Sequence, residues 1–564
     1  PFPQAEGKLY SDFKNANELR TSVVYVAAND GMVHGFNAGT GDEVIAYVPD
    51  NLMTNTYSNS ITELLNFEYA HEYFVDSTPA VNDVFMDVDG DGDKEWRTIL
   101  VNGQGKGGKA YVSLDITDPT KFNEGTAGEV ALWEFTDEDD TYPTDSTGAA
   151  LLTDEGGQRQ DLLAPALPVK DLGYSFSVPT IVMSNLTDPD GEHKWVTLFG
   201  NGYNSTSGIA KLFILFLEGG VDGVWCHPDL RHTPVPDGMV PSECVGKQDF
   251  VKLDTGFGVK NGLPNGLGEP RAIDVDGNQT ADYVYAGDYQ GNLFRFDITD
   301  SDHSNWTVQK IFQAQYEPGT SDEKDQPITA QPIAISHPTE SGFIIIFGSG
   351  SYIRTSDSTN EEIQSIYGIW DRLSPELISK ADLQQQKYTN VSDELGLLRT
   401  LTNNPVDYSV VGGKKGWYID LNSPTPGFPD SDPAEIPGER AVRNIQLRGG
   451  LGFVNSVFPQ VAGSCVGRAG GAILSFCPDT GGSECFNNRT IFDLNNDGQF
   501  EDNLSGGEIA AGIILVNPAP PTDSAFIGDR LVTQTGTQLN VISTNTFSGA
   551  NIGRLSWKRF ESVD

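Results

Sequence analysis

The sequence has few basic residues and no long apolar run. Of its 564 residues, 36 are Lys or Arg and 79 are Asp or Glu, so its formal net charge is −43. Phosphate binding depends on Lys and Arg, so this balance excludes a nucleic-acid binder that works through a general basic field. It also argues against simple attraction to anionic lipid. No stretch approaches the roughly 18 apolar residues of a membrane-spanning helix, and we expect no direct membrane span.

Cysteine is scarce, and its spacing does not suit a metal. The five cysteines are Cys226, Cys244, Cys465, Cys477 and Cys485. None forms a CxxC pair and no His stands at zinc-ligand spacing, which argues against a zinc site. Two cysteines share one polar, Pro-rich segment and three share another, which favours disulfides in an oxidising compartment, with the pairing open and one cysteine left over. The first ten residues lack the regions of a signal peptide. The chain is therefore either cytosolic or a mature or trimmed part of an exported protein, and the cysteines favour export.

Helical periodicity is also scarce. The best helical candidate is residues 379–387 (SKADLQQQK), where Ser379 and Asp382 have the spacing of a capping box. Elsewhere the chain shows short apolar or alternating runs that end in Gly, Asn or Asp. Examples are residues 23–28 (VVYVAA), 209–217 (IAKLFILFL), 283–286 (YVYA) and 343–347 (FIIIF). With 62 Gly and 32 Pro, this pattern predicts an all-β fold.

The apolar runs follow a repeated order. A strand begins near Pro79, Pro179, Pro270 and Pro332, an acidic loop follows, and an apolar strand then ends in a Gly-rich turn. Several short strands per unit, repeated several times, predict a β-propeller of about seven irregular blades with loop insertions and a few short helices. A large β-sandwich array is the alternative. We expect an N-terminal extension over residues 1–20 and a single propeller domain over residues 21–564.

Three acidic loops carry the strongest chemical signal. Positions 1, 3, 5 and 9 are Asp87, Asp89, Asp91 and Glu95 in the first loop, Asp274, Asp276, Asn278 and Asp282 in the second, and Asp493, Asn495, Asp497 and Glu501 in the third. This spacing lets one tight turn point several hard oxygens at a single centre, as Ca²⁺ requires, and position 7 normally adds its carbonyl. Position 7 is Asp93 in the first loop and Gln499 in the third.

The three loops predict calcium sites of the β-hairpin kind, because strand-like runs rather than helices flank them. Position 6 is Gly92 in the first loop and Gly498 in the third, but Gln279 in the second, which makes that turn costlier. Acidic turns arise by chance in so acidic a chain, yet three fully spaced copies favour calcium in at least one. Crowded carboxylates repel one another without the ion, so calcium should couple to local folding and act as a switch.

Signals of catalysis are weaker. Residues 103–109 (GQGKGGK) lack the spacing of a phosphate-binding loop, and the seven His are scattered without a HExxH or nucleophile motif. We therefore expect a non-enzymatic protein. One quinoprotein-like phrase at residues 29–43 leaves a calcium-dependent pyrroloquinoline quinone dehydrogenase as an alternative. A carbohydrate- or host-binding propeller adhesin is a further one.

Several phrases occur in the order found in one protein family. They are residues 25–36 (YVAANDGMVHGF), 71–79 (HEYFVDSTP), 198–203 (LFGNGY), 282–297 (DYVYAGDYQGNLFRFD), 416–421 (GWYIDL), 438–440 (GER) and 492–499 (FDLNNDGQ). From about residue 21 to about residue 520, the sequence resembles the C-terminal propeller domain of the PilY/PilC family of type IV pilus-associated biogenesis factors and adhesins. Relative to full-length members it lacks the large N-terminal part, and would correspond to their pilus-regulating half.

The resemblance implies a calcium site in the second loop. Asp274, Asp276, Asn278 and Asp282 would be side-chain ligands, and Thr280 would give its carbonyl. It also implies a role in pilus assembly and extension against retraction, in twitching motility and in surface adhesion. Implied partners are pilus components such as minor pilins or the pilus tip, and a host or abiotic surface. The implied location, after the periplasm, is the pilus tip, the outer-membrane surface or the extracellular space.

Overall fold

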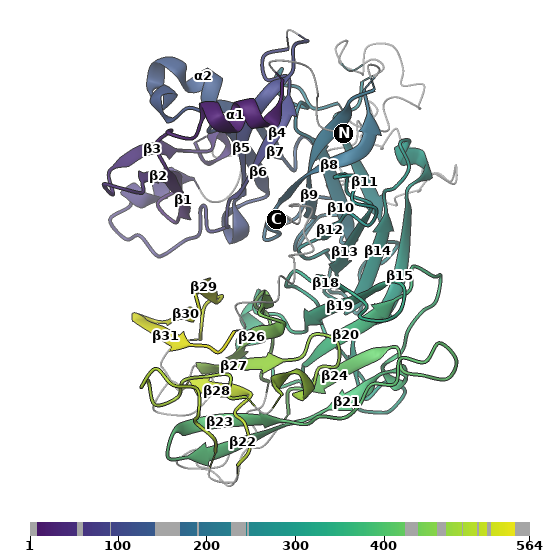
Figure 1. The fold of residues 1–564 in the computed structure, drawn as a ribbon. Coiled ribbons are helices and arrows are strands. Elements are labelled where there is room, and N and C mark those ends of the chain that lie inside the picture. The colour runs from purple at the N-terminus through teal and green to yellow at the C-terminus, as the bar shows by residue number, and fades with distance from the viewer. Residues whose placement is uncertain are drawn as a thin grey trace. The chain divides into compact units, whose positions relative to one another are not determined.

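The computed structural model describes residues 8–53, 60–90, 92–140, 170–188, 191–226, 244, 247–422, 438–459, 470–487, 489–504, 507–515 and 520–546. Strands dominate, and the α-helices are the short α1 (Tyr10–Ala16) and α2 (Ala127–Val130) (Figure 1). The 3₁₀ turns are η1 (Asp50–Leu52), η2 (Ile61–Leu65), η3 (Gly105–Gly107), η4 (Pro119–Lys121), η5 (Glu124–Thr126), η8 (His303–Asn305), η9 (Thr355–Thr359), η10 (Lys380–Asp382) and η11 (Glu484–Phe486). The all-β prediction is confirmed.

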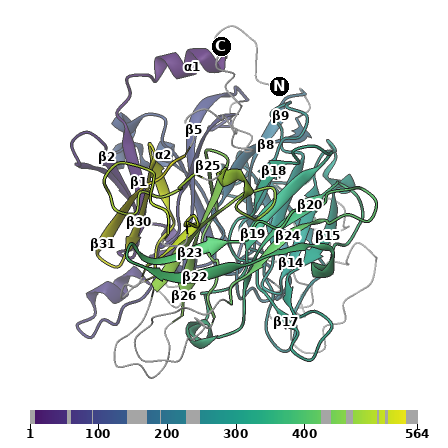
Figure 2. The same ribbon diagram turned by 60° about the horizontal axis from the view of Figure 1, so that its bottom comes forward.

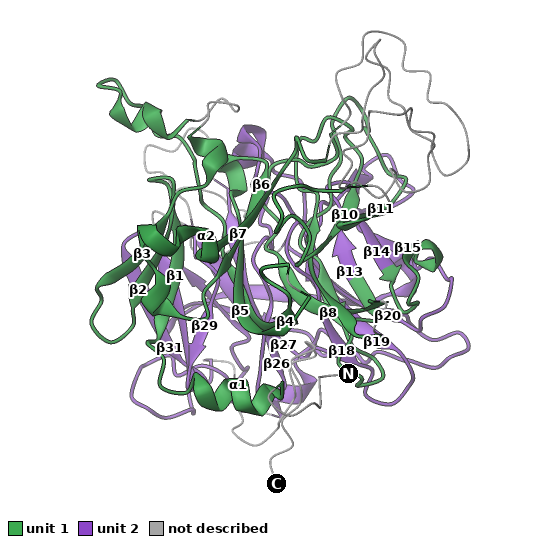
Figure 3. Cartoon of the chain, turned by 90° about the horizontal axis from the view of Figure 1, so that it is seen from above, with its two compact units in different colours: residues 1–284, 296–308 green, residues 285–295, 309–564 purple. Residues whose placement is uncertain are grey.

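The chain divides into two compact units, residues 1–284 with 296–308 and residues 285–295 with 309–564 (Figure 3). The first unit holds three antiparallel sheets, with strand orders β1-β2-β3, β4-β5-β6-β7 and β11-β10-β9-β8. Their strands are β1 (Val23–Ala28), β2 (Met32–Asn37), β3 (Glu43–Tyr47), β4 (Ala80–Met86), β5 (Glu95–Gly103), β6 (Ala110–Asp115), β7 (Ala131–Thr136), β8 (Thr180–Thr187), β9 (His193–Gly200), β10 (Lys211–Phe216) and β11 (Phe250–Asp254).

A fourth sheet, of order β12-β13-β14-β15, contains the boundary between the units. Its strands are β12 (Arg271–Ile273), β13 (Tyr283–Gly287), β14 (Asn292–Asp297) and β15 (Thr307–Gln313). Like the sheets before it, it is a meander in which each strand pairs with its neighbour in sequence. Such four-stranded meanders are the usual blades of a propeller.

The second unit holds a five-stranded sheet (β18-β19-β20-β24-β21), a six-stranded sheet (β22-β23-β28-β27-β26-β25), a three-stranded sheet (β29-β30-β31) and the β16-β17 pair. Strands β19, β20 and β24 run side by side in both views (Figures 1 and 2). The strands are β16 (Gln315–Tyr316), β17 (Lys324–Asp325), β18 (Ile333–Ser336), β19 (Phe343–Gly348), β20 (Ser365–Asp371), β21 (Gln384–Gln386), β22 (Tyr388–Asp393), β23 (Gly396–Leu401), β24 (Gly416–Asp420), β25 (Gln446–Arg448), β26 (Leu451–Phe458), β27 (Gly470–Phe476), β28 (Gly512–Leu515), β29 (Ala525–Ile527), β30 (Arg530–Thr535) and β31 (Gln538–Ser543).

The repeated prolines mark where sheets begin. Strands β4, β8, β12 and β18 start directly after Pro79, Pro179, Pro270 and Pro332, and each lies at the edge of its sheet. Proline has no N–H to donate, so an edge strand or a strand start accommodates it without loss of a ladder hydrogen bond. The expected relation between proline and strand start is therefore confirmed.

Inner strands of both units are buried on both faces. Every residue of β10 is buried in the first unit, and every residue of β19 and β27 is buried in the second. This burial explains why these strands read as continuous apolar runs rather than as alternating ones. Trp417, Phe453 and Ile473 belong to one core cluster of the second unit, whereas Phe74 and Leu100 belong to a cluster of the first.

The helix predicted over residues 379–387 is wrong beyond its first turn. The capping box exists, because Asp382 accepts hydrogen bonds from the backbone N–H and the hydroxyl of Ser379 at 2.9 and 2.7 Å. It caps only the single 3₁₀ turn η10, after which β21 pairs in parallel with β24. Strand pairing in the folded chain thus overrides the local helical preference of the glutamines.

The predicted disulfides are present. Cys226 pairs with Cys244 and Cys477 pairs with Cys485, while Cys465 lies outside the described residues. In the part of the chain that the structure describes, no helix combines the length and the apolar character needed to cross a bilayer.

Candidate calcium-binding loops

The three acidic loops have left-handed residues at the same two positions. The first lies between β4 and β5, the second between β12 and β13, and the third follows the isolated bridge of Phe492 with Thr544. Positions 4 and 6 are left-handed in all three loops, at Gly90 and Gly92, Gly277 and Gln279, and Asn496 and Gly498. Gln279 has φ +77°, and a left-handed residue with a Cβ costs about 1–2 kcal/mol. Gln279 therefore has the left-handed backbone on which the predicted cost of this turn rests, and the cost itself stays a prediction.

The aspartate at position 1 folds each loop around its own carboxylate. Asp274 accepts the N–H groups of Gly277 and Gln279 at 2.7 and 2.8 Å. Asp87 and Asp493 likewise accept backbone N–H groups from positions 3 to 6 of their loops at 2.8–3.2 Å. In each loop this carboxylate is therefore engaged with the backbone, and what distinguishes the loops is where their remaining carboxylates lie.

The second loop brings three carboxylates together. Oxygens of Asp274, Asp276 and Asp282 all lie within 4.8 Å of one another. Two ligands on one Ca²⁺ ion, each at about 2.3–2.6 Å from it, lie at most about 4.6–5.2 Å apart. The donor set and its spacing therefore fit a calcium ion. Among the described residues, this is the one cluster of three or more His, Cys, Asp or Glu side chains with such spacing.

Asp282 closes the second loop from within the fold. It is 6% exposed, and its carboxylate accepts the N–H of Val275 at 2.7 Å. Burial raises the pKa of Asp282, and the nearby carboxylates of Asp276 and Asp274 add to the rise, while the Val275 N–H acts against it. Like charges crowded in a partly desolvated place explain this direction, and a divalent cation among them would offset their repulsion.

Asn185 on β8 supports the loop from a different sheet, which the sequence reading missed. Its side-chain oxygen accepts the hydroxyl of Thr280 at 2.8 Å, and its side-chain N–H groups donate to the carbonyls of Ala281 and Ile298 at 3.0 and 3.2 Å. The same amide lies 3.4 Å from Asp282 Oδ1. Asn185 is 9% exposed, in a strand that also contains Ser184 and two threonines. No local sequence pattern pointed to this contact, because Thr280 lies 95 residues after Asn185.

The other two predicted ligands of the second loop lie next to each other. The amide oxygen of Asn278 accepts the backbone N–H of Thr280 at 2.8 Å, and it shares the Thr280 hydroxyl proton with Asn185 at an O–O distance of 2.6 Å. Thr280 is fully buried. In addition, the side-chain oxygen of Gln279 is buried and has no hydrogen-bond partner among the described residues. A buried oxygen without a hydrogen-bond partner costs free energy. The Gln279 oxygen is therefore a further acceptor that a bound ion or donor group would satisfy.

The first loop already has cationic neighbours. The ammonium of Lys8 lies 2.7 Å from Asp93, and Arg97 pairs with Glu95. Lys94 pairs with Asp188 and lies 3.5 Å from Glu218, so the β4–β5 turn is tied to acidic side chains outside it. Asp89 follows Asp87 in this loop, and Asp91 lies outside the described residues. Two of the predicted ligands are therefore paired with protein cations.

The third loop is closed one residue later than its spacing predicted. Asp502, 9% exposed, accepts the N–H groups of Leu494 and Asn495 at 2.8 and 3.2 Å. This is the position that Asp282 takes in the second loop, whereas Glu501 is exposed. The side chains of Asn495 and Asp497 contact each other at 3.1 Å, and Gln499 donates its N–H to Asp497 at 2.8 Å.

Comparison with known sequences relates the chain to PilY1 proteins. A family model described as the PilY1 beta-propeller domain matches residues 3–247 and 251–392. The chain is 31% identical over 476 residues to a type IV pilus biogenesis factor PilY1 homolog of Xylella fastidiosa, which covers 82% of this chain and 26% of that protein. It is 29% identical over 522 residues to the type IV pilus biogenesis factor PilY1 of Pseudomonas aeruginosa PAO1, over 87% of this chain and 37% of that protein.

The fold also matches a solved structure. The crystal structure of the Pseudomonas aeruginosa PilY1 C-terminal domain superposes with a TM-score of 0.64 and 25% identity, over 95% of each chain. This match and the seven described sheets of three or more strands confirm the predicted β-propeller of about seven blades. The chain spans well under half the length of the two curated relatives.

Proposed function

Because the chain belongs to the family of PilY1 β-propeller domains, we propose that it is the propeller of a type IV pilus biogenesis factor controlled by calcium in its second acidic loop. The proposed role is non-enzymatic. The propeller supports pilus assembly and extension against retraction, and through these twitching motility and surface adhesion. The names of the two relatives support a place in pilus biogenesis. The cluster of Asp274, Asp276 and Asp282 is the observation that carries the calcium part.

Each predicted ligand of the second loop would contribute a particular oxygen atom to the ion. Asp274, Asp276 and Asp282 would bind through carboxylate oxygens, Asn278 through its amide oxygen and Thr280 through its main-chain carbonyl. Among the described residues, no Lys or Arg forms an ion pair with these crowded carboxylates. Calcium would supply the positive charge that offsets their repulsion. Asp274 also accepts two backbone N–H groups of the loop, so the same residue would shape the turn and bind the ion.

A change in the conformation of the second loop would affect another sheet of the first unit. Asn185 joins Thr280 to β8, so an ion that fixes the loop also restrains the strand behind it. A ligand shifts an equilibrium only by its differential affinity for the two states. We therefore propose that the calcium-bound loop favours the form of the propeller that engages pilus components, such as minor pilins or the pilus tip.

The proposed location is outside the cytoplasm, at the pilus tip, the outer-membrane surface or the extracellular space. Two disulfides support it, because disulfides persist in oxidising compartments. A net charge of −43 suits a large exposed protein that must stay soluble. A host or abiotic surface is the second proposed partner.

The test is made in cells that express the full-length protein as the sole copy. Asp282→Ala removes the buried carboxylate that closes the second loop, and we expect it to reduce surface pili and twitching while the protein is still exported at normal abundance. Glu501→Gln, in the exposed part of the third loop, is the matched control and should leave both unchanged. Normal piliation and twitching in the Asp282→Ala strain would contradict the proposed calcium control. Normal piliation in a strain that lacks the protein would contradict the pilus role itself.

A further inference from the structure

The two disulfides differ in how well they are protected. Cys226 and Cys244 are 2% and 1% exposed. In the other pair Cys477 is fully buried, whereas Cys485 is only partly buried. A thiolate must reach a sulfur atom to exchange with it, so access decides which disulfide reacts and at which of its two sulfurs. In the second disulfide, Cys485 is therefore the more accessible of the two cysteines.

A cavity that is open to solvent lies against Cys485. It has a volume of about 310 Å³ and is lined by Gly449, Gly450, Leu451, Cys485, Asn487 and Arg489. A water molecule occupies about 30 Å³ in the liquid, so this space admits a molecule of several heavy atoms. Cysteine and other small thiols are of that size. The cavity contacts Cys485, and Cys477 is absent from its lining.

The buried cysteine is placed as the leaving group. The backbone N–H of Cys485 donates a hydrogen bond to Cys477 Sγ at 2.8 Å. A hydrogen bond to sulfur favours the thiolate over the thiol, and a thiol with a lower pKa leaves faster in exchange. Attack at Cys485 would thus release the sulfur that already has a donor directed at it.

We propose that the Cys477–Cys485 disulfide is a thiol-exchange site for small thiols, which attack at Cys485. The thiolate of the small molecule forms a bond to Cys485 Sγ, the bond between the two protein sulfurs breaks, and its electron pair stays on Cys477 Sγ as a thiolate. The product is a mixed disulfide on Cys485. The thiolate of a second small molecule then attacks the small molecule's sulfur in the mixed disulfide, the bond to Cys485 Sγ breaks, and its electron pair stays on Cys485 Sγ. Two small thiols are thereby oxidised to their disulfide, and Cys477 and Cys485 are left as thiolates that take up protons from water.

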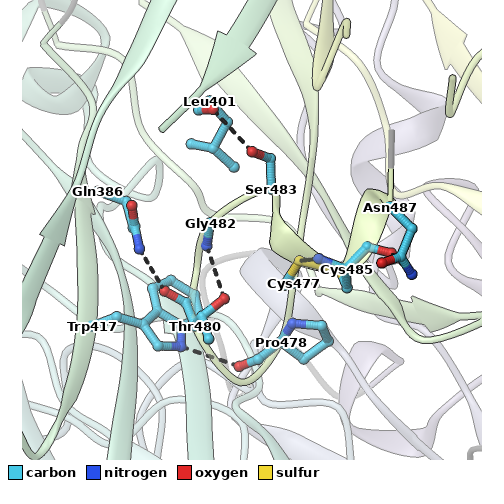
Figure 4. Close-up of a disulfide and its surroundings, with 10 residues drawn as sticks. All are labelled: Gln386, Leu401, Trp417, Cys477, Pro478, Thr480, Gly482, Ser483, Cys485 and Asn487. Atoms are coloured by element: carbon cyan, nitrogen blue, oxygen red, sulfur yellow. Dashed lines mark hydrogen bonds between the residues drawn. A yellow bond between two sulfur atoms is a disulfide. The ribbon is translucent and has the colours of Figure 1, made fainter. Parts of the chain in front are cut away.

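The loop between these cysteines forms hydrogen bonds with residues of three strands of the second unit, as Figure 4 shows. The carbonyl of Pro478 accepts the indole N–H of Trp417 on β24 at 3.1 Å. The carbonyl of Thr480 accepts the side-chain N–H of Gln386 on β21 at 3.0 Å, and Ser483 donates to the carbonyl of Leu401 on β23 at 3.1 Å. Exchange at Cys485 would loosen this loop, and Trp417, which is fully buried, would report the change.

The test uses the purified 564-residue chain in its oxidised form, with Cys465→Ser so that the fifth cysteine cannot take part. The chain is incubated with cysteine, the reaction is stopped with acid, and mixed disulfides are mapped by mass spectrometry over time. We expect the cysteine adduct on Cys485, formed at least ten-fold faster than any adduct on Cys226 or Cys244. An adduct first on Cys477, or equal rates for the two disulfides, would overturn the proposal.

Two controls separate the effect of the fold from intrinsic reactivity. In 6 M guanidinium chloride the two disulfides should react at similar rates, because both are then exposed; a persisting ten-fold difference would overturn the explanation by access. A thiol attached to a bulky polymer should lose most of its rate at Cys485 in the folded chain, and an unchanged rate would contradict entry through the cavity. Tryptophan fluorescence should change as the adduct forms, and Trp417→Phe should remove that change.

Discussion

The side chain of Asn185 and the hydroxyl of Thr280, 95 residues apart, meet in a hydrogen bond of 2.8 Å. Through this contact a strand of one sheet, β8, helps to shape an acidic loop that connects two strands of another. The same Asn185 amide also holds the carbonyls of Ala281 and Ile298. The shape of the second loop therefore depends on more than the loop's own sequence.

Asn185→Leu should weaken calcium binding although it removes no proposed ligand. It leaves the carbonyls of Ala281 and Ile298 without the amide that donates to them, and each unsatisfied buried group costs about 1–3 kcal/mol. We expect a calcium affinity at least ten-fold lower by titration calorimetry. Asn455→Leu removes another buried amide, which donates to Thr522 and Thr533, and should cost stability without changing that affinity. Equal calcium affinities in wild type and Asn185→Leu would contradict this account of the loop.

Asp502, rather than Glu501, should matter in the third loop. Asp502 accepts two backbone N–H groups in a buried place, and hydrogen bonds to a charged group are worth about 1.5–3 kcal/mol. Asp502→Asn should therefore lower the free energy of unfolding by about 1–3 kcal/mol in urea titrations. Glu501→Gln, at an exposed side chain, should change it by less than about 0.5 kcal/mol. If the two variants lose equal stability, Asp502 does not close the loop as described.

The left-handed residue at position 6 gives a second stability test. Gly498 has φ +82° and open space where a Cβ would stand, so Gly498→Ala should cost about 1–2 kcal/mol through backbone conformation alone. Gln279→Gly relieves the same strain in the second loop but adds about 0.5–1 kcal/mol of unfolded-state entropy. We therefore expect Gln279→Gly to be close to neutral. Chemical unfolding of both variants without calcium checks this, and a large loss from Gln279→Gly would show that its side chain packs.

Much of the fold could be predicted from the sequence, because its signals are local. Pro79 and Pro270 have no backbone N–H to donate, so each predicts the start of an edge strand without any knowledge of the neighbouring strands. The three acidic loops follow from spacing within nine residues. The helix predicted from Ser379 failed because Gln384 to Gln386 pair with β24, a strand some 30 residues later, and no local pattern encodes that pairing.

The parts of the site that sequence reasoning missed depend on distant residues. Asn185 reaches the second loop across about 95 positions, and Lys8 reaches Asp93 across 85. Spacing alone also gave no sign of Asp502, which accepts the N–H of Leu494 one residue beyond the predicted ligand Glu501. The pairing of Cys477 with Cys485 rather than Cys465 likewise needed three-dimensional proximity.

The buried pair of Arg399 and Glu439 should be the most sensitive ionic contact of the second unit. Both side chains are almost fully buried, and they form a bidentate contact at 2.7 and 2.8 Å. Removal of one charge leaves the other buried and unpaired, which costs about 3–5 kcal/mol. Glu439→Gln should lower the free energy of unfolding by that amount. Glu376→Gln breaks the more exposed pair with Arg372 and should cost less than about 1 kcal/mol.

His34 should make stability fall as the pH rises. Burial acts to lower its pKa, but hydrogen bonds to Glu43 and Asp30 outweigh burial and raise it above 6.5. A raised histidine pKa adds stability that is fully present below the unfolded pKa and is lost as the pH rises through the folded pKa. Urea unfolding at several pH values above 6.5 should show this decline, and His34→Gln should flatten it. An unchanged slope in His34→Gln would assign the decline to other groups.

Calcium titration of the purified chain tests the central claim most directly. Calorimetry would compare wild type with Asp274→Asn/Asp276→Asn, which keeps side-chain size but removes two charges of the clustered carboxylates. Glu95→Gln and Glu501→Gln serve as matched controls in the first and third loops. The account predicts a binding step in wild type that the double variant loses and both controls keep. Absence of calcium binding in wild type, or the same step in the double variant, would contradict it.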